Sequence, residues 1–326
     1  MDFFIVGAPR CGTTALSRYL KAHPGVCFAK PKEPQYFATA DLSGLSGADL
    51  DARLQADYVA RFFPARDPAR HLCGEGSVGY IYSAAALQAI VRWNPAARLI
   101  VMLRDPVGML ASYHARLLYL MDETEPDLEA AWRLVAARTQ GRHLPRTCRD
   151  PKMLRYDEVA RLGKYTEQLF DIAGREHVLP IVHDDLKADP GAVYRRVLAF
   201  LGLPDDGRQD FPRIRAGSGY RSPRLQRTLQ RPPRLLLRHL MSKDGAKRRT
   251  HGTPVPGGGT GGSDGRASSG GRGLSPRKLR KRLLAWNTTD QPPPPLRPEF
   301  AAELRAFYAE DIARLGHLID RDLSHW

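Results

Sequence analysis

Two short stretches of the sequence combine an arginine with hydroxyl side chains in a spacing that suits anion binding. The first reads GAPRCGTT over residues 7–14, between an apolar run and a helical pattern. Glycines five apart in such a turn arrange backbone N–H groups around an oxyanion, and the N-terminus of the following helix adds partial positive charge. The predicted anion-binding residues are Arg10, Cys11, Gly12, Thr13 and Thr14.

This first stretch resembles a P-loop, G-x-x-x-x-G-K-[ST], with one change. Thr13 stands at the lysine position, and the cation is Arg10, two residues before the second glycine. An enzyme that acts on a nucleoside triphosphate needs that lysine on the β- and γ-phosphates and a Ser or Thr on magnesium. The moved cation indicates a different anion. A P-loop nucleotide kinase or NTPase stays open as an alternative, as does a tight strand–helix turn that binds no ligand.

The second stretch begins with Arg104, directly after the apolar run RLIVML, and includes Ser112 eight residues later. A side chain at a strand end and one two turns into the next helix can meet at a single anion, with a forked guanidinium and a hydroxyl as donors. Taken alone, this stretch also fits an Arg104–Asp105 pair and a surface serine. Together, the two stretches predict two anion sites at one edge of a sheet.

The elements that would position these residues follow from hydrophobic periodicity. Short apolar runs predict strands, and longer amphipathic runs predict helices. Strands that alternate with helices imply a parallel sheet in an α/β fold, whose ligands bind at the carboxyl ends of the strands. The predicted strands are residues 3–6, 26–28, 71–74, 98–103 and 177–182, and the predicted helices are residues 13–21, 51–62, 84–93, 106–118, 128–138, 160–173 and 191–201.

With these motifs, the sequence resembles the sulfotransferases that use 3′-phosphoadenosine 5′-phosphosulfate (PAPS). The stretch from Arg10 to Thr14 is similar to the 5′-phosphosulfate loop of that family, and Arg104 with Ser112 is similar to its 3′-phosphate site. The resemblance implies a P-loop-like three-layer fold, with a central parallel sheet flanked by helices. It covers about residues 1–240 and 275–326.

Further residues resemble the carbohydrate and heparan-type branch of that family. They are HP at residues 23–24 and KEPQYF at residues 32–37, whereas EGSVGY at residues 75–80 lacks the lysine and the proline of the matching family segment. By this resemblance, Glu33 is the general base that takes the acceptor proton. Lys32 beside it steers an anionic acceptor or touches the sulfonate.

The resemblance implies transfer of a sulfuryl group from PAPS, as co-substrate and without a metal, to a hydroxyl or amine of a carbohydrate, lipid or natural product. Arg10 would stabilise charge that develops on the bridging oxygen. His114 and His183 compete with the glutamate for the role of base. By family position, Tyr220 and Arg221 lie in a loop that closes over the nucleotide, where Arg221 would add to the 3′-phosphate site.

The charge of the chain is concentrated in one segment. The 326 residues carry 50 Lys and Arg against 35 Asp and Glu, a net charge of +15. Residues 208–282 hold 20 of these cations and three of the acids, a net charge of +17, so the rest of the chain is close to neutral. This pattern favours an enzyme-like body with one basic segment over a globally basic nucleic-acid-binding domain.

The expected partner is a small-molecule or glycan acceptor and not a nucleic acid. A non-catalytic polyanion binder that works through the basic segment remains the third alternative, and it predicts steeply salt-dependent binding.

The same segment suggests how the chain is organised. Residues 251–273 contain ten glycines among 23 residues and no aromatic side chain, so they cannot bury enough apolar surface to offset the entropy of ordering. We expect a sulfotransferase α/β domain over residues 1–240, a basic, Gly-rich and disordered insertion over residues 241–274, and C-terminal helices over residues 275–326 that pack back on the same domain.

Cysteine usage and hydropathy point to an intracellular protein. The four cysteines form no CxxC pair, which argues against a zinc site and against a disulfide framework. The sequence has no run of 18 apolar residues, and its first ten residues lack the basic region of a secretory signal. We therefore expect a cytoplasmic protein without a transmembrane segment and without a metal.

Overall fold

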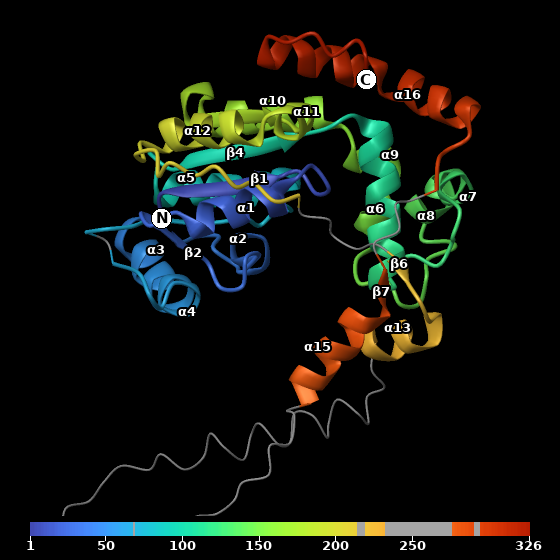
Figure 1. Ribbon diagram of the computed structural model, residues 1–326, viewed down its shortest axis with the longest axis horizontal. Coiled ribbons are helices and arrows are strands. Elements are labelled where there is room, and N and C mark those ends of the chain that lie inside the picture. Colours follow the sequence, from blue (N-terminus) through green and yellow to red (C-terminus); the bar gives the residue numbers. More distant parts are fainter. Residues whose placement is uncertain (68, 214–218, 232–275, 290–293) are drawn as a thin grey trace, which may run out of the picture.

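Five parallel strands form the central sheet of the computed structural model, which describes residues 1–67, 69–213, 219–231, 276–289 and 294–326. The strand order is β2-β3-β1-β4-β5 (Figure 1). Strands buried on both faces carry continuous apolar runs, as FFIV and LIVML do in the two central strands. The predicted parallel α/β fold is confirmed. The strands are β1 (Phe3–Gly7), β2 (Val26–Phe28), β3 (Leu72–Glu75), β4 (Arg98–Leu103) and β5 (Val178–Val182).

Helices connect successive strands and cover the sheet. α1 (Thr13–Ala22) packs on β1 and β2, and α12 (Pro190–Leu201) packs on β5. The other helices of the body are α2 (Tyr36–Thr39), α3 (Gly47–Leu54), the π-helical turn η1 (Gln55–Val59), α4 (Ala60–Phe62), η2 (Tyr80–Tyr82), α5 (Ala84–Trp93), α7 (Leu128–Arg133), α8 (Val135–Thr139), η3 (Pro151–Leu154), α9 (Tyr156–Val159), α10 (Leu162–Ala173), η4 (Arg175–His177) and α11 (His183–Ala188).

Helix α6 (Pro106–Leu120) leaves the carboxyl end of β4 and stands beside the sheet (Figure 1). Its start is well defined, because Asp105 accepts a hydrogen bond from the backbone N–H of Gly108 at 2.5 Å and Pro106 occupies the first turn. It ends at Met121, which has the left-handed φ of 61°. The helix therefore extends from the edge of the sheet to a separate part of the molecule.

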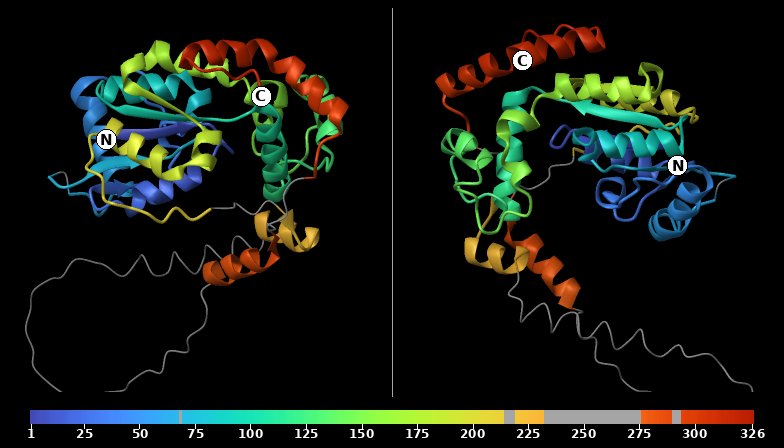
Figure 2. Two further views of the ribbon diagram at one scale, coloured as in Figure 1. Left: turned by 45° about the horizontal axis from the view of Figure 1, so that its top comes forward. Right: turned by 180° about the vertical axis from the view of Figure 1, so that it is seen from behind.

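The C-terminal helix α16 (Pro298–Ile319) packs along α10 and closes that side of the molecule (Figure 2). Leu304, Tyr308 and Leu315 are buried in this contact. Asp311 accepts hydrogen bonds from the backbone N–H groups of Gly163 and Lys164, at 2.8 and 2.9 Å. These two groups lie in the first turn of α10, where helix N–H groups have no partner within the helix. The contact between α16 and α10 thus combines buried apolar side chains with a carboxylate that caps the N-terminus of α10.

A small unit lies at the far end of α6. It consists of residues 219–231 and 276–289, and we call it the α13–α15 unit. Its elements are β6 (Gly219–Tyr220), α13 (Pro223–Gln230), α15 (Pro276–Asn287) and β7 (Thr288–Thr289), and the two strands pair antiparallel.

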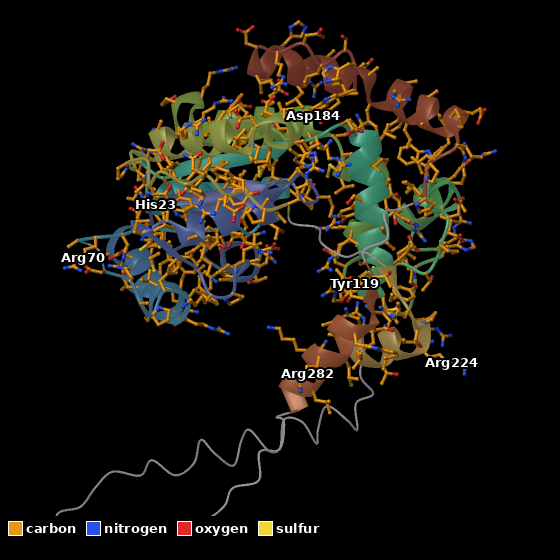
Figure 3. All side chains as sticks on the ribbon, in the orientation of Figure 1. His23, Arg70, Tyr119, Asp184, Arg224 and Arg282 are labelled. Carbon is orange, nitrogen blue, oxygen red and sulfur yellow. The ribbon has the colours of Figure 1, made fainter. Side chains whose placement is uncertain are left out.

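Buried polar side chains fasten this unit together and to α6. The amide of Asn287 donates to Oε1 of Gln226 at 2.9 Å, and both side chains are fully buried. Gln226 in turn donates to the backbone oxygen of Tyr119 at 2.7 Å, and the Tyr119 hydroxyl lies 2.9 Å from Oγ1 of Thr288. Figure 3 places Tyr119 at the end of α6, next to the two helices.

Two expected helices are corrected. The helix expected over residues 51–62 begins at Gly47 and passes through a π-helical turn, and the helix expected over residues 128–138 is two helices that meet at Leu134. α11 and the β6–β7 pair were not expected. The disorder expected for residues 251–273 and the expected insertion over residues 241–274 fall outside the described residues. No described helix is both long and apolar enough to cross a bilayer.

Candidate functional site

The loop between β1 and α1, residues 7–14, has the backbone conformation of an anion site. Arg10 and Gly12 have left-handed φ angles of 66° and 92°, and α1 begins at Thr13. At Gly12 a Cβ would lie 2.9 Å from Leu186 Cδ2, so the position requires glycine on two grounds. Within the described part of the chain, the backbone N–H groups of residues 11–14 donate no hydrogen bond. Four such free donors next to a helix N-terminus suit a bound anion.

The two predicted anion-binding stretches touch each other. Nε of Arg10 donates to Oγ of Ser112 at 2.8 Å, and a terminal nitrogen of Arg104 donates to the backbone oxygen of Arg10 at 3.2 Å. Arg10 lies on the β1–α1 loop, Arg104 at the end of β4, and Ser112 two turns into α6. The structure thus places the three residues at one edge of the sheet, but in the described residues Ser112 is bonded to Arg10 and not to Arg104, the residue with which it was expected to share an anion.

Carboxylates neutralise the positive charge of this region only in part. In the described residues, neither Arg10 nor Arg116 has a carboxylate oxygen within 4.0 Å, whereas Nε of Arg104 lies 3.6 Å from Oδ2 of Asp105 and has no hydrogen-bond partner. Burial, together with the positive charges of Arg116 and Arg104, lowers the pKa of Arg10 to about 10. Burial also lowers the pKa of Arg116. Cations held close together at this cost are typical of a site that receives an anion.

Arg116 is a member of this group that the sequence analysis missed. It follows Ser112 by four residues on α6, so both side chains lie on the same face of the helix. Its guanidinium lies 5.1 Å from the centre of the Tyr119 ring. The i, i+4 spacing from a predicted anion ligand is the signal that could have identified it.

Lys32 and Glu33 lie on the loop that follows β2. Nζ of Lys32 and Oε1 of Glu33 form an ion pair at 2.8 Å, with 39% of the Glu33 side chain exposed. The negative charge of Glu33 acts on the pKa of Arg116, so the loop is within electrostatic reach of the arginine group. No described hydrogen bond or ion pair joins Glu33 to Arg10 or to the β1–α1 loop. The role of base for Glu33 stays a prediction.

The loop that carries Lys32 and Glu33 is held by hydrogen bonds to Gly76 and Ser77, which follow the carboxyl end of β3. The backbone N–H of Gly76 donates to the oxygen of Lys32 at 3.0 Å, and the N–H of Gln35 donates to Oγ of Ser77 at 2.9 Å. Ser77 in turn donates to Oε2 of Glu75 at 2.5 Å. The position of the two predicted acceptor-side residues therefore depends on Glu75.

Glu75 is a fully buried carboxyl group, although the sequence analysis treated its segment only as a family landmark. The hydroxyls of Tyr58 and Tyr80 donate to its Oε1 at 2.8 and 2.9 Å. Burial raises the pKa of Glu75 to about 7, and the three hydroxyl donors oppose this shift without cancelling it.

The two candidate histidines occupy different surroundings. Nδ1 of His114 lies 3.0 Å from the Tyr156 hydroxyl and Nε2 lies 3.3 Å from the oxygen of Pro126, so both ring nitrogens face partners within the protein. His183 lies beside the β1–α1 loop, with Cδ2 3.1 Å from where a Cβ at Gly12 would be. Burial lowers its pKa to about 4, so His183 is neutral at physiological pH. The partners of both ring nitrogens fit a structural role for His114.

Cys11 is part of the β1–α1 loop, whereas Tyr220 and Arg221 lie in the α13–α15 unit. Cys11 is fully buried, and burial raises the pKa of its thiol to about 12. Tyr220 lies in β6, and the Arg221 guanidinium lies 5.8 Å from the centre of the Trp286 ring. Among the described residues, no hydrogen bond or ion pair connects Tyr220 or Arg221 to the arginine group. Residues 217 and 218 of the predicted nucleotide-covering loop lie outside the described part of the chain.

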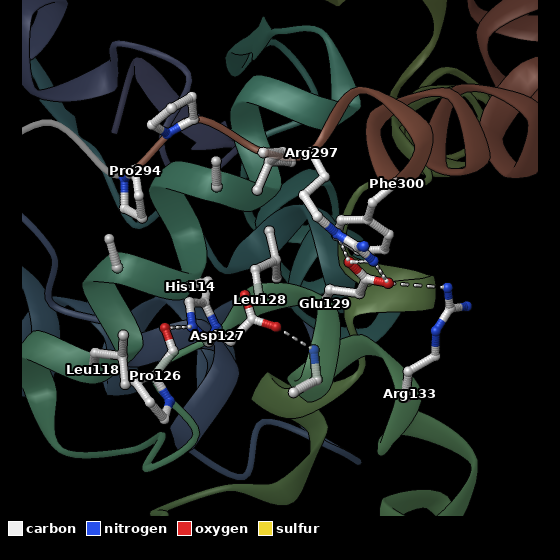
Figure 4. A pocket seen from close by; sticks show the side chains of 15 residues that line it. His114, Leu118, Pro126, Asp127, Leu128, Glu129, Arg133, Pro294, Arg297 and Phe300 are labelled. Carbon is white, nitrogen blue, oxygen red and sulfur yellow. Dashed lines mark hydrogen bonds and ion pairs between the residues drawn. The ribbon is translucent and has the colours of Figure 1, made fainter.

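A cavity of about 520 Å³ lies on a different face of α6 from Ser112 and Arg116 (Figure 4). Ala111, Ala115 and Leu118 contribute from α6, and Phe300 contributes from α16. Arg297 pairs with Glu129 at its rim, at 2.6 Å. The cavity is mostly apolar and does not include the arginine group. In the described residues, no three His, Cys, Asp or Glu side chains come together as metal ligands.

The family model of the sulfotransferase family matches residues 2–207 of the chain. Together with the parallel α/β fold and the arginine-bearing loop at its edge, this match shows that the chain belongs to the sulfotransferase family. The predicted family resemblance is confirmed at that level.

Two individual proteins illustrate the similarity. The membrane-associated sulfotransferase kil1 of Dictyostelium discoideum is 28% identical over 131 residues, which are 39% of this chain and 26% of that protein. The match thus spans about a quarter of the length of that relative. A crystal structure of a sulfotransferase from Alicyclobacillus acidocaldarius is 23% identical and has a TM-score of 0.61, covering 100% of this chain and 98% of the other. This second likeness shows that the two proteins share their fold.

Proposed function

We propose that the protein transfers a sulfuryl group from PAPS to a hydroxyl or amine of an acceptor. The observation that carries the proposal is the contact between the β1–α1 loop and α6, which joins Arg10, Ser112 and Arg104 at the carboxyl edge of the sheet. PAPS carries two anionic groups, at its 3′ and 5′ positions. Backbone N–H groups that donate no hydrogen bond, and a guanidinium such as that of Arg10, which has no carboxylate within 4.0 Å in the described residues, are the donors that these groups require.

The residues divide into two binding functions. The N–H groups of residues 11–14 and the Arg10 guanidinium bind the 5′-phosphosulfate end, and Arg104 with Ser112 binds the 3′-phosphate. The buried Nε of Arg104 lies 3.6 Å from Oδ2 of Asp105 and has no hydrogen-bond partner in the described residues, which supports this assignment. Arg10 also stabilises negative charge on the oxygen that leaves the sulfur, because it is positioned beforehand by its bond to Ser112. His183 adds no charge here, since it is neutral.

The acceptor side consists of Glu33 and Lys32. Glu33 accepts the proton of the attacking hydroxyl, and Lys32 stabilises either the sulfonate or an anionic acceptor. Their mutual ion pair leaves the carboxylate exposed to an incoming acceptor. Arg116 places a further positive charge between this loop and Arg10, which favours an acceptor with an anionic group near the reacting hydroxyl.

The kinase or NTPase alternative has less support. The Thr13 side chain is 5% exposed, and it stands where such an enzyme has its phosphate-binding lysine. A direct test is thermal shift of the full chain with adenosine 3′,5′-bisphosphate (PAP) or with ATP and magnesium. We expect stabilisation by PAP, no need for magnesium, and loss of the effect in Arg10→Ala.

Release of PAP from PAPS is then followed with a panel of hydroxyl and amine acceptors, in the presence and absence of EDTA. Acceptor-dependent release that survives EDTA supports the proposal. Stabilisation by ATP with magnesium, together with chelator-sensitive ATP hydrolysis, contradicts it and restores the NTPase alternative.

A further inference from the structure

The α13–α15 unit exposes large apolar side chains on one helix face. Leu279 and Trp286 of α15 are 47% and 60% exposed, and only one other large apolar side chain of the described residues, Phe307, is comparably open. The two residues are seven positions apart, which is two helical turns, so they lie on the same face. Leu283, between them on that face, is half-buried. The result is an apolar stripe along α15 that contacts solvent.

Positive charge surrounds this stripe. Residues 219–231 and 279–289 contain seven Lys or Arg and no Asp or Glu. Six of these cations are exposed, and the seventh, Arg231, pairs with Asp122 at 2.5 Å. Figure 3 shows Arg224 on α13 and Arg282 on α15, on the side of the molecule away from the sheet. The exposed cations are Arg221, Arg224, Arg227, Arg280, Lys281 and Arg282.

The stripe is held outward by the rest of the unit. The side of α15 next to the stripe is fixed by the buried Gln226–Asn287 bond and by Arg280, which donates to the backbone oxygen of Leu229 at 2.8 Å. The Arg221 guanidinium lies near the Trp286 ring, so a cation accompanies the exposed indole. Neither helix can turn the stripe inward without breaking these buried contacts. The exposure is therefore built into the described part of the fold, and an exposed apolar patch of this kind marks an interaction site.

We propose that the α13–α15 unit binds the surface of an anionic lipid bilayer. A short helix with Trp and Leu on one face and cations on the others lies in the plane of the headgroups, with the apolar face toward the acyl chains. The cations are attracted to anionic headgroups. α15 has 12 residues, roughly 18 Å in length, which is less than the roughly 30 Å hydrocarbon core, so it rests on the bilayer and does not span it.

The apolar stripe distinguishes a bilayer from a soluble polyanion. A nucleic acid or an acidic polysaccharide would use the cations, but it offers no apolar layer for Leu279 and Leu283. The proposal therefore requires that both the charge and the stripe contribute to binding. It does not depend on the proposed sulfuryl transfer, since the α13–α15 unit contains none of the residues assigned to the reaction except Tyr220 and Arg221.

The charge requirement is tested with the full chain in vesicle flotation. We expect binding to phosphatidylcholine vesicles that contain about 30 mol% phosphatidylglycerol, weak binding to phosphatidylcholine alone, and a loss of about 10-fold or more in Lys281→Glu/Arg282→Glu. Arg195→Glu/Arg196→Glu is the matched control, because these two exposed arginines lie next to each other on α12 and give the same change of charge. Equal losses in both double variants would show that only net charge matters and would overturn the proposal.

The apolar requirement is tested at Trp286. Fluorescence of the full chain should shift to the blue on anionic vesicles, and the shift should vanish in Trp286→Phe, because Trp93, Trp132 and Trp326 are more buried. Trp286→Ala should weaken vesicle binding and leave heparin binding unchanged. If Trp286→Ala binds vesicles like the parent, or if heparin and duplex DNA bind more tightly than vesicles, the unit is a polyanion site. Thermal shift with PAP confirms that each variant is folded, because none of these residues lies near the β1–α1 loop.

Discussion

Nε of Arg10 donates a 2.8 Å hydrogen bond to Oγ of Ser112, although 102 positions separate the two residues. The bond joins the loop after the first strand of the chain to the helix after the fourth. The two predicted anion-binding stretches are therefore joined directly, so a shift of either element should change the position of the Arg10 guanidinium. This coupling has measurable consequences.

Arg10 and Ser112 should be energetically coupled in PAP binding. Ser112→Ala removes a hydroxyl that both orients Arg10 and donates to the ligand, and we expect a loss of about 1–3 kcal/mol. Arg10→Ala should cost about 2–4 kcal/mol, because a charge-assisted contact is lost. The double variant should lose less than the sum, as residues in contact do. Calorimetric titration of the four proteins measures the coupling, and strict additivity would show that the bond is irrelevant to binding.

Arg104 should distinguish ligands by their 3′-phosphate. Arg104→Ala should weaken PAP by about 2–4 kcal/mol, the scale of a lost charge-assisted pair, and should hardly change binding of 5′-AMP. The comparison is made by titrating both nucleotides into the parent and the variant. Equal losses for the two nucleotides would remove Arg104 from the 3′-phosphate site.

Glu33 should affect chemistry more than binding. General-base catalysis contributes typically ~10²–10⁴-fold, so Glu33→Gln should lower kcat for a hydroxyl acceptor by about that factor, with PAP affinity within about 2-fold. A neutral amine acceptor, which attacks through its lone pair without prior loss of a proton, should be less affected. Lys32→Gln is the matched control, because it breaks the same ion pair and keeps the carboxylate. Full activity of Glu33→Gln on a hydroxyl acceptor would leave the base unassigned.

Glu75 should make stability depend on pH. Its pKa in the folded protein is about 7, above the ordinary value of 4.5, so the folded state holds a proton that the unfolded state releases between these pH values. The contribution of this proton to the free energy of unfolding is complete below pH 4.5. It is lost as the pH rises to 7, and the loss amounts to about 3 kcal/mol. Glu75→Gln resembles the protonated form and lacks this loss.

The comparison is made by calorimetric melting of both proteins from pH 5 to pH 8. Other titrating groups cancel in the difference, so the Tm of Glu75→Gln relative to the parent should rise with pH. A difference that stays constant would show that Glu75 keeps its ordinary pKa.

Cys11 should be chemically inert in the native protein. Its thiol is fully buried and its pKa is raised to about 12, so little thiolate forms near pH 8. Cys27 and Cys148, which are half-buried, should be alkylated first by iodoacetamide. Mass spectrometry of the tryptic peptide from Cys11 to Arg18 measures the labelling. Rapid native labelling of that peptide would show that the loop opens.

The strands could be predicted closely because the signal for each was local. β2 and β4 are observed at their expected residues, since a short apolar run between polar turns leaves few other choices. The break at Leu134 could not be predicted, because no Gly or Pro marks it and the change of helix direction depends on tertiary contacts. β6 and β7 have two residues each and exist only through pairing across 67 intervening residues.

The candidate site likewise contains features that could be predicted from local sequence and features that depend on tertiary contacts. The β1–α1 loop was visible in the sequence because glycine spacing and helix start are local features. The bond between Arg10 and Ser112 was not, because it depends on where α6 stands relative to β1. The burial of Glu75 could not be predicted from the sequence, because it depends on Tyr58, which lies on a separate helix.

The α13–α15 unit is built from two segments that are far apart in the chain, and α16 then fastens the second segment to α10. A protein made as two pieces, residues 1–231 and 276–326, would keep every contact of the unit described above. The pieces should find each other on mixing, and linking the original ends elsewhere should give a permuted chain with new termini between the halves of the unit. The surface proposed to meet lipid is thus also the place where this enzyme scaffold can be split and reassembled.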